Sequence, residues 1–429
     1  MIGSSKASRW KRLDNAAKIF PSNSNKRDTK VFRFACELQE AVQQETLQCA
    51  LEETLKLFPL YRSVLKRGLF WYYLEETDMK PLVKEEYRPP CSPIYDKNTK
   101  TLLFEVTYFR NRINLEVYHA LTDGTGALAF LRVLVCRYLL LVHPRELAEA
   151  SPFIDYDATL AQKEDDSFQK YYSGKKQPLH VKRKRAFSLH GIKLPEYRIH
   201  ITEGVIPADQ VIKKAREYHT TVTVLLTSLF LLAIHTQQSV REQKNPVAVN
   251  IPVNLRKFFP SQSARNFFGL ITVAYDFSSQ PDALEAVIAY VGDFFKQELT
   301  KEKMELRMNT YTAIERNILA RVVPLPMKDV VLHISGSFSN REITGALSNV
   351  GVVSMPKEFE PYIRLFDVFT ATNRLQICMC SYQNNMVVSF TSPFVSCDIE
   401  KHFFRSLTAM GIPVELAANR MGDEKEKSR

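Results

Sequence analysis

Hydrophobic positions recur along this chain with two periodicities, one typical of helices and the other of strands. Leu47, Leu51 and Leu55 lie at the spacing of one helix face, in a stretch that stops before Pro59. Alternation of apolar and polar residues predicts strands, two of which should form a hairpin around residues 110–112. For the first half we expect strands at 30–37, 70–74, 101–108 and 113–118, a short helix at 14–20 ended by Pro21, and a long helix at 125–142.

The second half repeats this mixture of strands and helices. Its expected strands cover residues 197–203, 246–252, 269–277, 330–335, 363–371, 375–382 and 386–391. Its expected helices cover residues 208–218, 221–235, 282–305 and 398–410. Strands mixed with long helices in both halves predict an α/β protein built from a pair of sandwich-like units.

Between the halves, residues 161–185 are polar and charged and show no sustained apolar period. A chain of 429 residues is also long for one core and suits two domains of about 200 residues. We therefore expect a boundary in this region. The predicted division is an N-terminal half at 1–165, a linker at 166–190, a C-terminal half at 191–417 and a disordered tail at 418–429.

The composition is that of an ordinary globular protein, with 45% hydrophobic and 24% charged residues. The two most apolar stretches are 127–142, which contains Arg132 and Arg137, and 222–234, which is shorter than the roughly 20 residues of a membrane span. We interpret both as buried helices and expect no transmembrane segment. The start of the chain lacks the apolar core of a secretory signal.

Seven cysteines are irregularly spaced and include no C-x-x-C pair, which favours a reduced, cytoplasmic setting. The net charge of +11 suits a phosphorylated small molecule, anionic lipid or nucleic acid. Its one dense basic run, 182–185, is typical of a solvated linker. Because no basic and aromatic stripe accompanies it, we expect no nucleic-acid partner. We expect a monomer.

The strongest chemical signal lies where the predicted strand 113–118 meets the predicted helix. His119 follows the strand, and Asp123 and Gly124 stand at the helix start. A histidine has a pKa near neutrality, so His119 can accept a proton from a substrate. Asp123 is a good helix cap, and Gly124 permits close approaches that a side chain would block.

Other interpretations of this segment must be weighed. His119 could be a buried, hydrogen-bonded residue beside an ordinary cap. A shared metal with Asp123 lacks a third ligand, and the pair precedes the helix, so we expect no metal site. Residues 124–129 match the loose pattern G-x-G-x-x-A of a dinucleotide-binding loop, but no strand follows Val142, as that fold requires.

H-x-x-x-D-G is the hallmark of the chloramphenicol acetyltransferase-like superfamily, which this chain resembles over most of its length. That superfamily includes condensation domains of peptide synthetases and stand-alone acyltransferases. Three further segments resemble its motifs: the strand-then-arginine stretch 250–256, the aromatic-glycine stretch 266–269 and the late motif 347–351. The chain is most similar to stand-alone bacterial alcohol acetyltransferase-like members.

The resemblance implies two similar sandwich domains with the active-site tunnel between them. His119 would be the general base that takes a proton from an alcohol or amine acceptor. The acyl donor would be the thioester of acyl-CoA or of an acyl carrier protein, and no cofactor would be bound permanently. The tetrahedral oxyanion needs hydrogen-bond donors, for which the Gly124 backbone N–H is a candidate.

Asp123 is expected to be structural, because in this superfamily it pairs with an arginine from the other half. Arg256 is the candidate partner, and Arg265 is its nearest rival. Ser389 and Thr391, on a late strand, are further candidate oxyanion donors, although a cross-strand or solvated role is the simpler interpretation.

Three functional hypotheses follow. The first is an O- or N-acyltransferase, and the second is a condensation-type enzyme that accepts only carrier-bound acyl groups. The third is a catalytically inactive module that binds a ligand or carrier protein. An intact His119 and Asp123 favour the enzymes, because a binding module has no need of a base. No G-x-S-x-G stretch is present, so a covalent serine mechanism is unsupported.

Overall fold

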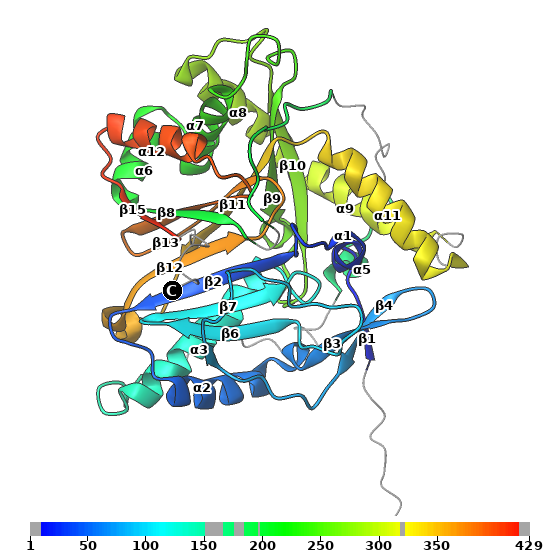
Figure 1. Cartoon of the computed structure of the whole chain (residues 1–429), viewed down its shortest axis with the longest axis vertical. Coiled ribbons are helices and arrows are strands. Elements are labelled where there is room, and N and C mark those ends of the chain that lie inside the picture. The colour runs from blue at the N-terminus through cyan, green and yellow to red at the C-terminus, as the bar shows by residue number, and fades with distance from the viewer. Residues whose placement is uncertain (1–9, 151–165, 176–183, 196–197, 318–321, 420–429) are drawn as a thin grey trace, which may run out of the picture.

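The chain folds into two lobes, each a sheet with helices on its outer side (Figure 1). The computed structural model describes residues 10–150, 166–175, 184–195, 198–317 and 322–419. The predicted α/β class is confirmed. Most of the linker predicted at 166–190 is described. Residues 176–183 lie outside the described residues, and they include Lys182 and Arg183, the first two residues of the basic run.

The N-terminal lobe is built on a five-stranded sheet. In spatial order its strands are β12 (Ile363–Thr370), β2 (Val31–Leu38), β7 (Arg112–Tyr118), β6 (Phe104–Phe109) and β5 (Lys84–Glu85). Helices α2 (Gln44–Leu57) and α3 (Gly124–Val142) pack together below this sheet (Figure 1). A small side sheet holds β1 (Trp10–Arg12), β4 (Tyr72–Glu76) and β3 (Ser63–Arg67), and the short helices here are η1 (Ala17–Ile19), α1 (Phe20–Asn23) and η2 (Pro59–Tyr61).

The C-terminal lobe is built on a seven-stranded sheet. In spatial order its strands are β10 (Phe268–Tyr275), β9 (Val247–Asn254), β11 (Gly345–Val353), β13 (Leu375–Tyr382), β14 (Asn385–Ser392), β8 (His200–Pro207) and β15 (Glu415–Ala418). Four helices cover its outer face (Figure 1): α6 (Ala208–Glu217), α7 (Val222–His235), α8 (Leu284–Glu298) and α12 (Asp398–Ala409). The remaining helices are α5 (Ser167–Lys170), η3 (Leu255–Lys257), α9 (Lys301–Arg316), α11 (Leu325–Asn340) and η4 (Lys357–Tyr362).

One strand crosses the proposed division of the chain. β12 comes from the second half, yet it pairs antiparallel with β2, so that Phe366 lies opposite Cys36. Side chains of β8 and β13, among them Ile201 and Cys378, join the hydrophobic core of the N-terminal lobe. The lobes therefore share apolar packing and a strand, and the site between them rests on a common framework.

Several predicted elements need correction. Residues 330–335 were expected as a strand but lie in α11, and the helix expected at 282–305 is two helices. Thr300 stands between them and caps the start of α9, because its Oγ1 accepts from the Lys303 amide. Pro21 stands in the first turn of α1, where its missing N–H is harmless, so it begins this helix and does not end one. Ala418, placed in the predicted tail, belongs to β15.

Helix α3 has the length and hydropathy of a membrane span, and among the described residues it is the one single helix that does. More than half of its most apolar window is buried. Phe130, Leu131 and Leu134 are fully enclosed by the N-terminal lobe. Helices α6 and α7 pass the same test only as a pair bent by 83°. The two apolar stretches predicted as buried helices are confirmed as α3 and α7.

Replacing Gly204 by Ala tests the packing of α12 on β8. A Cβ at position 204 would lie 2.2 Å from Cε1 of Phe404, whose ring is enclosed by Phe390 and Phe403. We expect Gly204→Ala to lower the free energy of unfolding by about 1–3 kcal/mol, as overpacking does, in urea denaturation followed by circular dichroism. Gly292→Ala in α8 is the control, because its Cβ would meet nothing nearer than 4.0 Å. Equal stability of Gly204→Ala and the wild type would contradict this packing.

Candidate active site

His119 lies at the junction of the two lobes, directly after β7. Its backbone N–H donates to the carbonyl of Lys30 at 2.9 Å, which extends the pairing of β7 with β2 by one residue. A short loop then leads to Asp123, the N-cap of α3. The Asp123 Oδ1 accepts from the amides of Thr125 and Gly126, both at 3.1 Å. Strand and cap together fix the segment from both ends.

Three aromatic rings surround the His119 imidazole. Phe20 of α1 stacks on it with ring centroids 4.6 Å apart, Phe32 of β2 lies at 4.8 Å, and Phe268 of β10 lies at 5.7 Å. The residue as a whole is half-buried. Burial lowers the pKa of His119 below its usual value of 6.5, while the Asp123 carboxylate and the Asn266 hydrogen bond act in the opposite direction. The ring is therefore neutral at physiological pH.

The side-chain amide of Asn266 determines which nitrogen of His119 carries the proton. Its Nδ2 donates to the His119 carbonyl at 3.1 Å and to Asp14 Oδ2 at 3.2 Å, so its Oδ1 is the atom that faces His119 Nδ1, at 3.2 Å. The flipped amide would set oxygen against two acceptors. Nδ1 must therefore be the N–H donor, and Nε2 carries the free lone pair.

Asp14 supports this amide from the N-terminal segment. Its carboxylate is buried and accepts from the Ala17 amide at 2.8 Å and from the Asn266 backbone N–H at 3.3 Å. Burial raises the pKa of Asp14 to about 6, and the Arg265 guanidinium, with its Nε 3.8 Å from Oδ2, opposes the rise. Above that pH the carboxylate is charged and orients the Asn266 amide.

The structure brings Asp123 and Arg256 together across the lobes. Arg256 Nη1 donates to Asp123 Oδ2 at 2.7 Å, and the Phe267 amide donates to the same oxygen at 2.9 Å. The second guanidinium nitrogen donates to the carbonyls of Ser263 and Arg265. With four donors on its two oxygens, Asp123 acts as a link between α3 and the segment before β10. Arg265, the rival candidate, lies beside Asp14 instead.

The close approach expected at Gly124 occurs at Gly126. A Cβ on Gly124 would meet only the Phe34 ring at 3.7 Å, an ordinary contact. A Cβ on Gly126 would lie 2.3 Å from the carbonyl oxygen of Ala264 and 2.1 Å from Thr122 Oγ1. Gly126 therefore lets the first turn of α3 touch the other lobe. Gly124 contributes a half-exposed backbone N–H at the helix N-terminus.

The two late-strand candidates differ from each other. Ser389 is fully buried, and its Oγ donates to Asp367 Oδ1 at 2.5 Å, so its hydrogen is committed to that carboxylate. Thr391 is also fully buried, but its Oγ1 has no hydrogen-bond partner among the described residues. Of the two, only Thr391 has a hydroxyl that is not committed to a described protein acceptor.

A groove of about 1110 Å³ adjoins the segment on the side of the C-terminal lobe. Strands β9 and β11 pair only around residues 249–250 and 345–346, and beyond that point the groove passes between them. Its lining includes Thr221 at the N-terminus of α7, Lys296 of α8 and Asn254. The Asn254 Nδ2 donates to Thr125 Oγ1 at 3.2 Å, so one lining residue of the groove contacts the first turn of α3.

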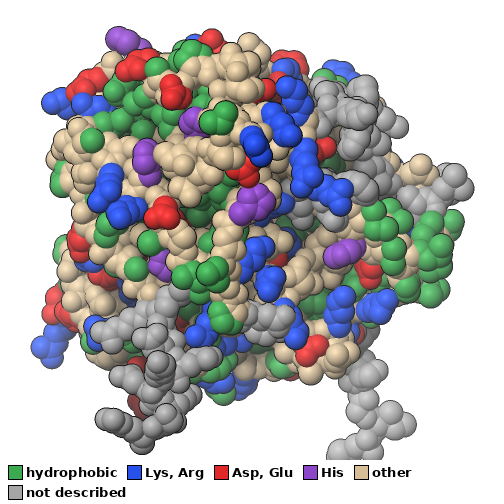
Figure 2. All heavy atoms as spheres, turned by 45° about the horizontal axis from the view of Figure 1, so that its top comes forward, with side chains coloured by type: hydrophobic (Ala, Val, Ile, Leu, Met, Phe, Trp, Pro, Cys, Tyr) green, Lys and Arg blue, Asp and Glu red, His purple; other side chains and the backbone are tan. Residues whose placement is uncertain are grey.

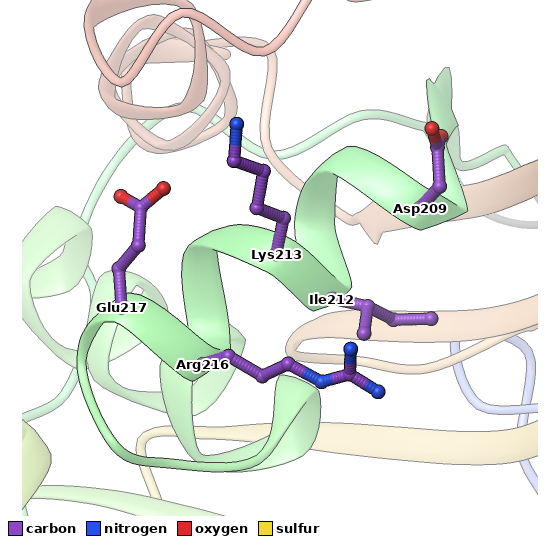
Figure 3. A pocket seen from close by; sticks show the side chains of 5 residues that line it. All are labelled: Asp209, Ile212, Lys213, Arg216 and Glu217. Carbon is purple, nitrogen blue, oxygen red and sulfur yellow. The ribbon is translucent and has the colours of Figure 1, made fainter.

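A second hollow, of about 510 Å³, lies along the outer side of α6 (Figure 3). All its lining residues belong to that one helix: Asp209, Ile212, Lys213, Arg216 and Glu217. None of them contacts the His119 segment, so it is not the site. The tunnel expected between the lobes stays a prediction.

The sequence patterns did not reveal the roles of Asp14, Asn266 and Phe20. Asn266 opens the aromatic-glycine stretch, which marks it as part of a motif without showing its partner. Asp14 and Phe20 lie about 100 residues before His119, in a segment for which the sequence predicted only a short helix. Only the fold brings these three residues to the imidazole.

The architecture is similar to that of solved acyltransferases and condensation domains. TRI101 of F. sporotrichioides, complexed with coenzyme A and T-2, superposes with a TM-score of 0.61 at 10% identity, covering 95% of this chain and 100% of that chain. TRI3 trichothecene 15-O-acetyltransferase from Fusarium sporotrichioides gives 0.58 at 13% identity, covering 95% of each chain. The first condensation domain of the CDA synthetase gives 0.57 at 13% identity, covering 95% and 97%.

These likenesses define the class of fold. No family model and no curated protein sequence matches the chain. The chain has the two-lobed fold of these solved acyltransferases and condensation domains, so the predicted fold is confirmed. The likeness to alcohol acetyltransferases in particular stays a prediction.

A double-mutant cycle measures the link between the lobes. We expect Asp123→Ala and Arg256→Ala each to lower the free energy of unfolding by about 3–5 kcal/mol, because each leaves a buried charge unpaired. The double variant should lose much less than the sum. Chemical denaturation gives all three values. The exposed pair Lys296 and Asp293 is the control, with an expected coupling of about 0.5 kcal/mol or less. Additive losses at positions 123 and 256 would contradict the link.

Proposed function

We propose that this protein is an acyltransferase that moves an acyl group from a thioester to an alcohol or amine, with His119 as general base. The observation that carries the proposal is the Asn266 amide, which holds Nδ1 of His119 protonated and leaves Nε2 as a neutral base. The lowered pKa of His119 supports it, because the ring is ready to accept a proton at physiological pH.

In the proposed reaction, His119 Nε2 removes the proton from the acceptor O–H or N–H as that atom attacks the thioester carbonyl. The carbonyl oxygen becomes an oxyanion, for which the Gly124 amide and the Thr391 hydroxyl are our candidate donors. Collapse of the tetrahedral intermediate re-forms the carbonyl and breaks the carbon–sulfur bond. The leaving thiolate then takes the proton from the His119 imidazolium, which restores the neutral base.

The groove beside α3 is our candidate for the donor arm. It lies partly between strands, and Asn254 in its lining contacts Thr125, next to the helix N-terminus that carries Gly124. Lys257 in its lining suits the phosphates that coenzyme A and a carrier-protein arm both present, whereas Lys296 is paired with Asp293. Fold neighbours include a complex with coenzyme A and condensation domains, so both donor types are consistent with the fold. All seven cysteines are free, as suits a cytoplasmic enzyme.

Replacement of His119 by Ala is the direct test. With an acyl-CoA or a loaded carrier protein and a panel of alcohols and amines, we expect thiol release to fall roughly 10²–10⁴-fold, the usual contribution of a general base. His402→Ala, an exposed histidine on α12, is the control and should keep full activity. Turnover with carrier-bound donors alone would identify the condensation-type enzyme. Full activity in a folded His119→Ala protein would refute the mechanism, and inactivity of the wild type toward both donors would favour the binding module.

The pH dependence tests the state of the imidazole. Because burial lowers the pKa of His119, kcat/KM should fall only as the pH drops below 6.5, where the base becomes protonated. Removing the Asn266 acceptor takes away an interaction that favours the protonated ring. We therefore expect Asn266→Ala to lower the maximal kcat/KM about tenfold or more, because the base is mispositioned. The fall of kcat/KM on the acid side should move to lower pH. A shift to higher pH would instead indicate acid unfolding of a damaged protein.

A further inference from the structure

Helix α11 packs on the protein with its polar side inward. Asp329 accepts from Ser22 Oγ at 2.7 Å and from Tyr72 OH at 2.9 Å. Lys328 is buried, lies 3.6 Å from the centroid of the Trp71 ring, and donates to the Phe70 carbonyl at 3.0 Å. In a helix on the surface of a globular protein the apolar side normally faces the core. α11 has the reverse arrangement.

The outward side of α11 is an apolar row. Met327, Val330, Val331 and Ile334 are exposed by 61%, 58%, 61% and 49%. They recur at i, i+3, i+4 and i+7, which places them on one face of the helix. Figure 2 shows hydrophobic side chains gathered at the edge of the molecule where Figure 1 places α11. These four residues are called the α11 row below.

The tip of the β3–β4 hairpin continues this surface. The Leu325 amide donates to the Leu69 carbonyl at 2.9 Å, which fixes the tip against the start of α11. Leu69 and Phe70 are themselves exposed. The apolar surface therefore spans two elements that are far apart in the sequence, and contiguous exposed surfaces of this kind mark interaction sites.

Exposed cations stand in the segments that adjoin this surface. Arg67, two residues before Leu69, is exposed at the hairpin tip. Lys26 and Arg27 are exposed just after α1, the helix against which α11 packs. The α11 row itself carries no charge. An apolar helix face with cations at its margin is typical of helices that lie in the interface of an anionic membrane.

We propose that the α11 row, with Leu69 and Phe70, docks this protein onto an anionic lipid membrane. A second copy of the chain is a poorer occupant, because docking row to row would bring the cationic margins together. The net charge of +11 favours an anionic lipid surface as well.

The location of the surface gives docking a consequence for chemistry. α11 packs on α1, and α1 begins with Phe20, whose ring stacks on His119. One short helix therefore separates the membrane-facing row from the imidazole. This inference goes beyond the proposed acyl transfer and does not need it, although a docked enzyme could draw acyl groups or acceptors directly from the lipid.

Vesicle co-sedimentation of the full-length protein tests the proposal. The wild type should sediment with phosphatidylserine-containing vesicles, weakly with phosphatidylcholine alone, and less as salt rises. The double variant Val331→Asp with Ile334→Asp should lose about tenfold or more of the vesicle affinity, since two charges oppose insertion. The matched control is Val240→Asp with Ile192→Asp, which places the same changes at exposed positions outside α11 and should bind as the wild type does.

Circular dichroism shows whether both double variants are folded. His119→Ala should keep full vesicle binding, so a failed acyl-transfer hypothesis leaves this test unaffected. A wild type that ignores anionic vesicles, or a Val331 and Ile334 double variant that still binds them, would overturn the proposal. So would light scattering that finds a wild-type dimer which the same double variant disperses, since the row would then be a contact between two copies.

Discussion

The carboxylate of Asp123 is the interaction on which the site depends. One of its oxygens caps α3 of the N-terminal lobe, and the other accepts from Arg256 and from the Phe267 amide of the C-terminal lobe. Because these donors come from both lobes, the position of α3 is set relative to the segment 263–267. That segment carries Asn266, so the residue that orients His119 is placed by the same carboxylate.

The environment of His119 balances two opposing demands. Burial among aromatic rings lowers the pKa of the imidazole and keeps it unprotonated, but it would also leave a buried ring N–H without a partner. Asn266 satisfies that N–H with an uncharged oxygen and so fixes the ring without placing a negative charge against it. A carboxylate at this place would raise the pKa of His119 and make it a base that is already protonated near neutrality.

Local patterns predicted the elements whose burial follows a simple period, and failed where distant contacts decide. The strand at 375–382 was predicted with the bounds it has, because both its faces are buried and it is short and apolar. α11 was mistaken for a strand because Val330, Val331 and Ile334 are β-branched; their helical spacing is visible only once they are known to share an exposed face. The pairing of β12 with β2, some 330 residues away, and the contacts of Asp14 have no local signature.

The same difference explains which parts of the site could be inferred from the sequence. His119, Asp123 and Gly124 stand within six residues, so their placement at a strand end and a helix start follows from neighbouring residues. The chemistry of His119 depends on groups from two other segments: the Asp14 carboxylate and the Phe20 ring near the N-terminus, and the Asn266 amide. Asp14 holds a negative charge only above a pH of about 6, and the neutral Asn266 amide transmits its orienting effect. The Asn266 amide lies between two titrating groups. Through it the Asp14 carboxylate aligns the imidazole without contacting the ring that must accept the proton.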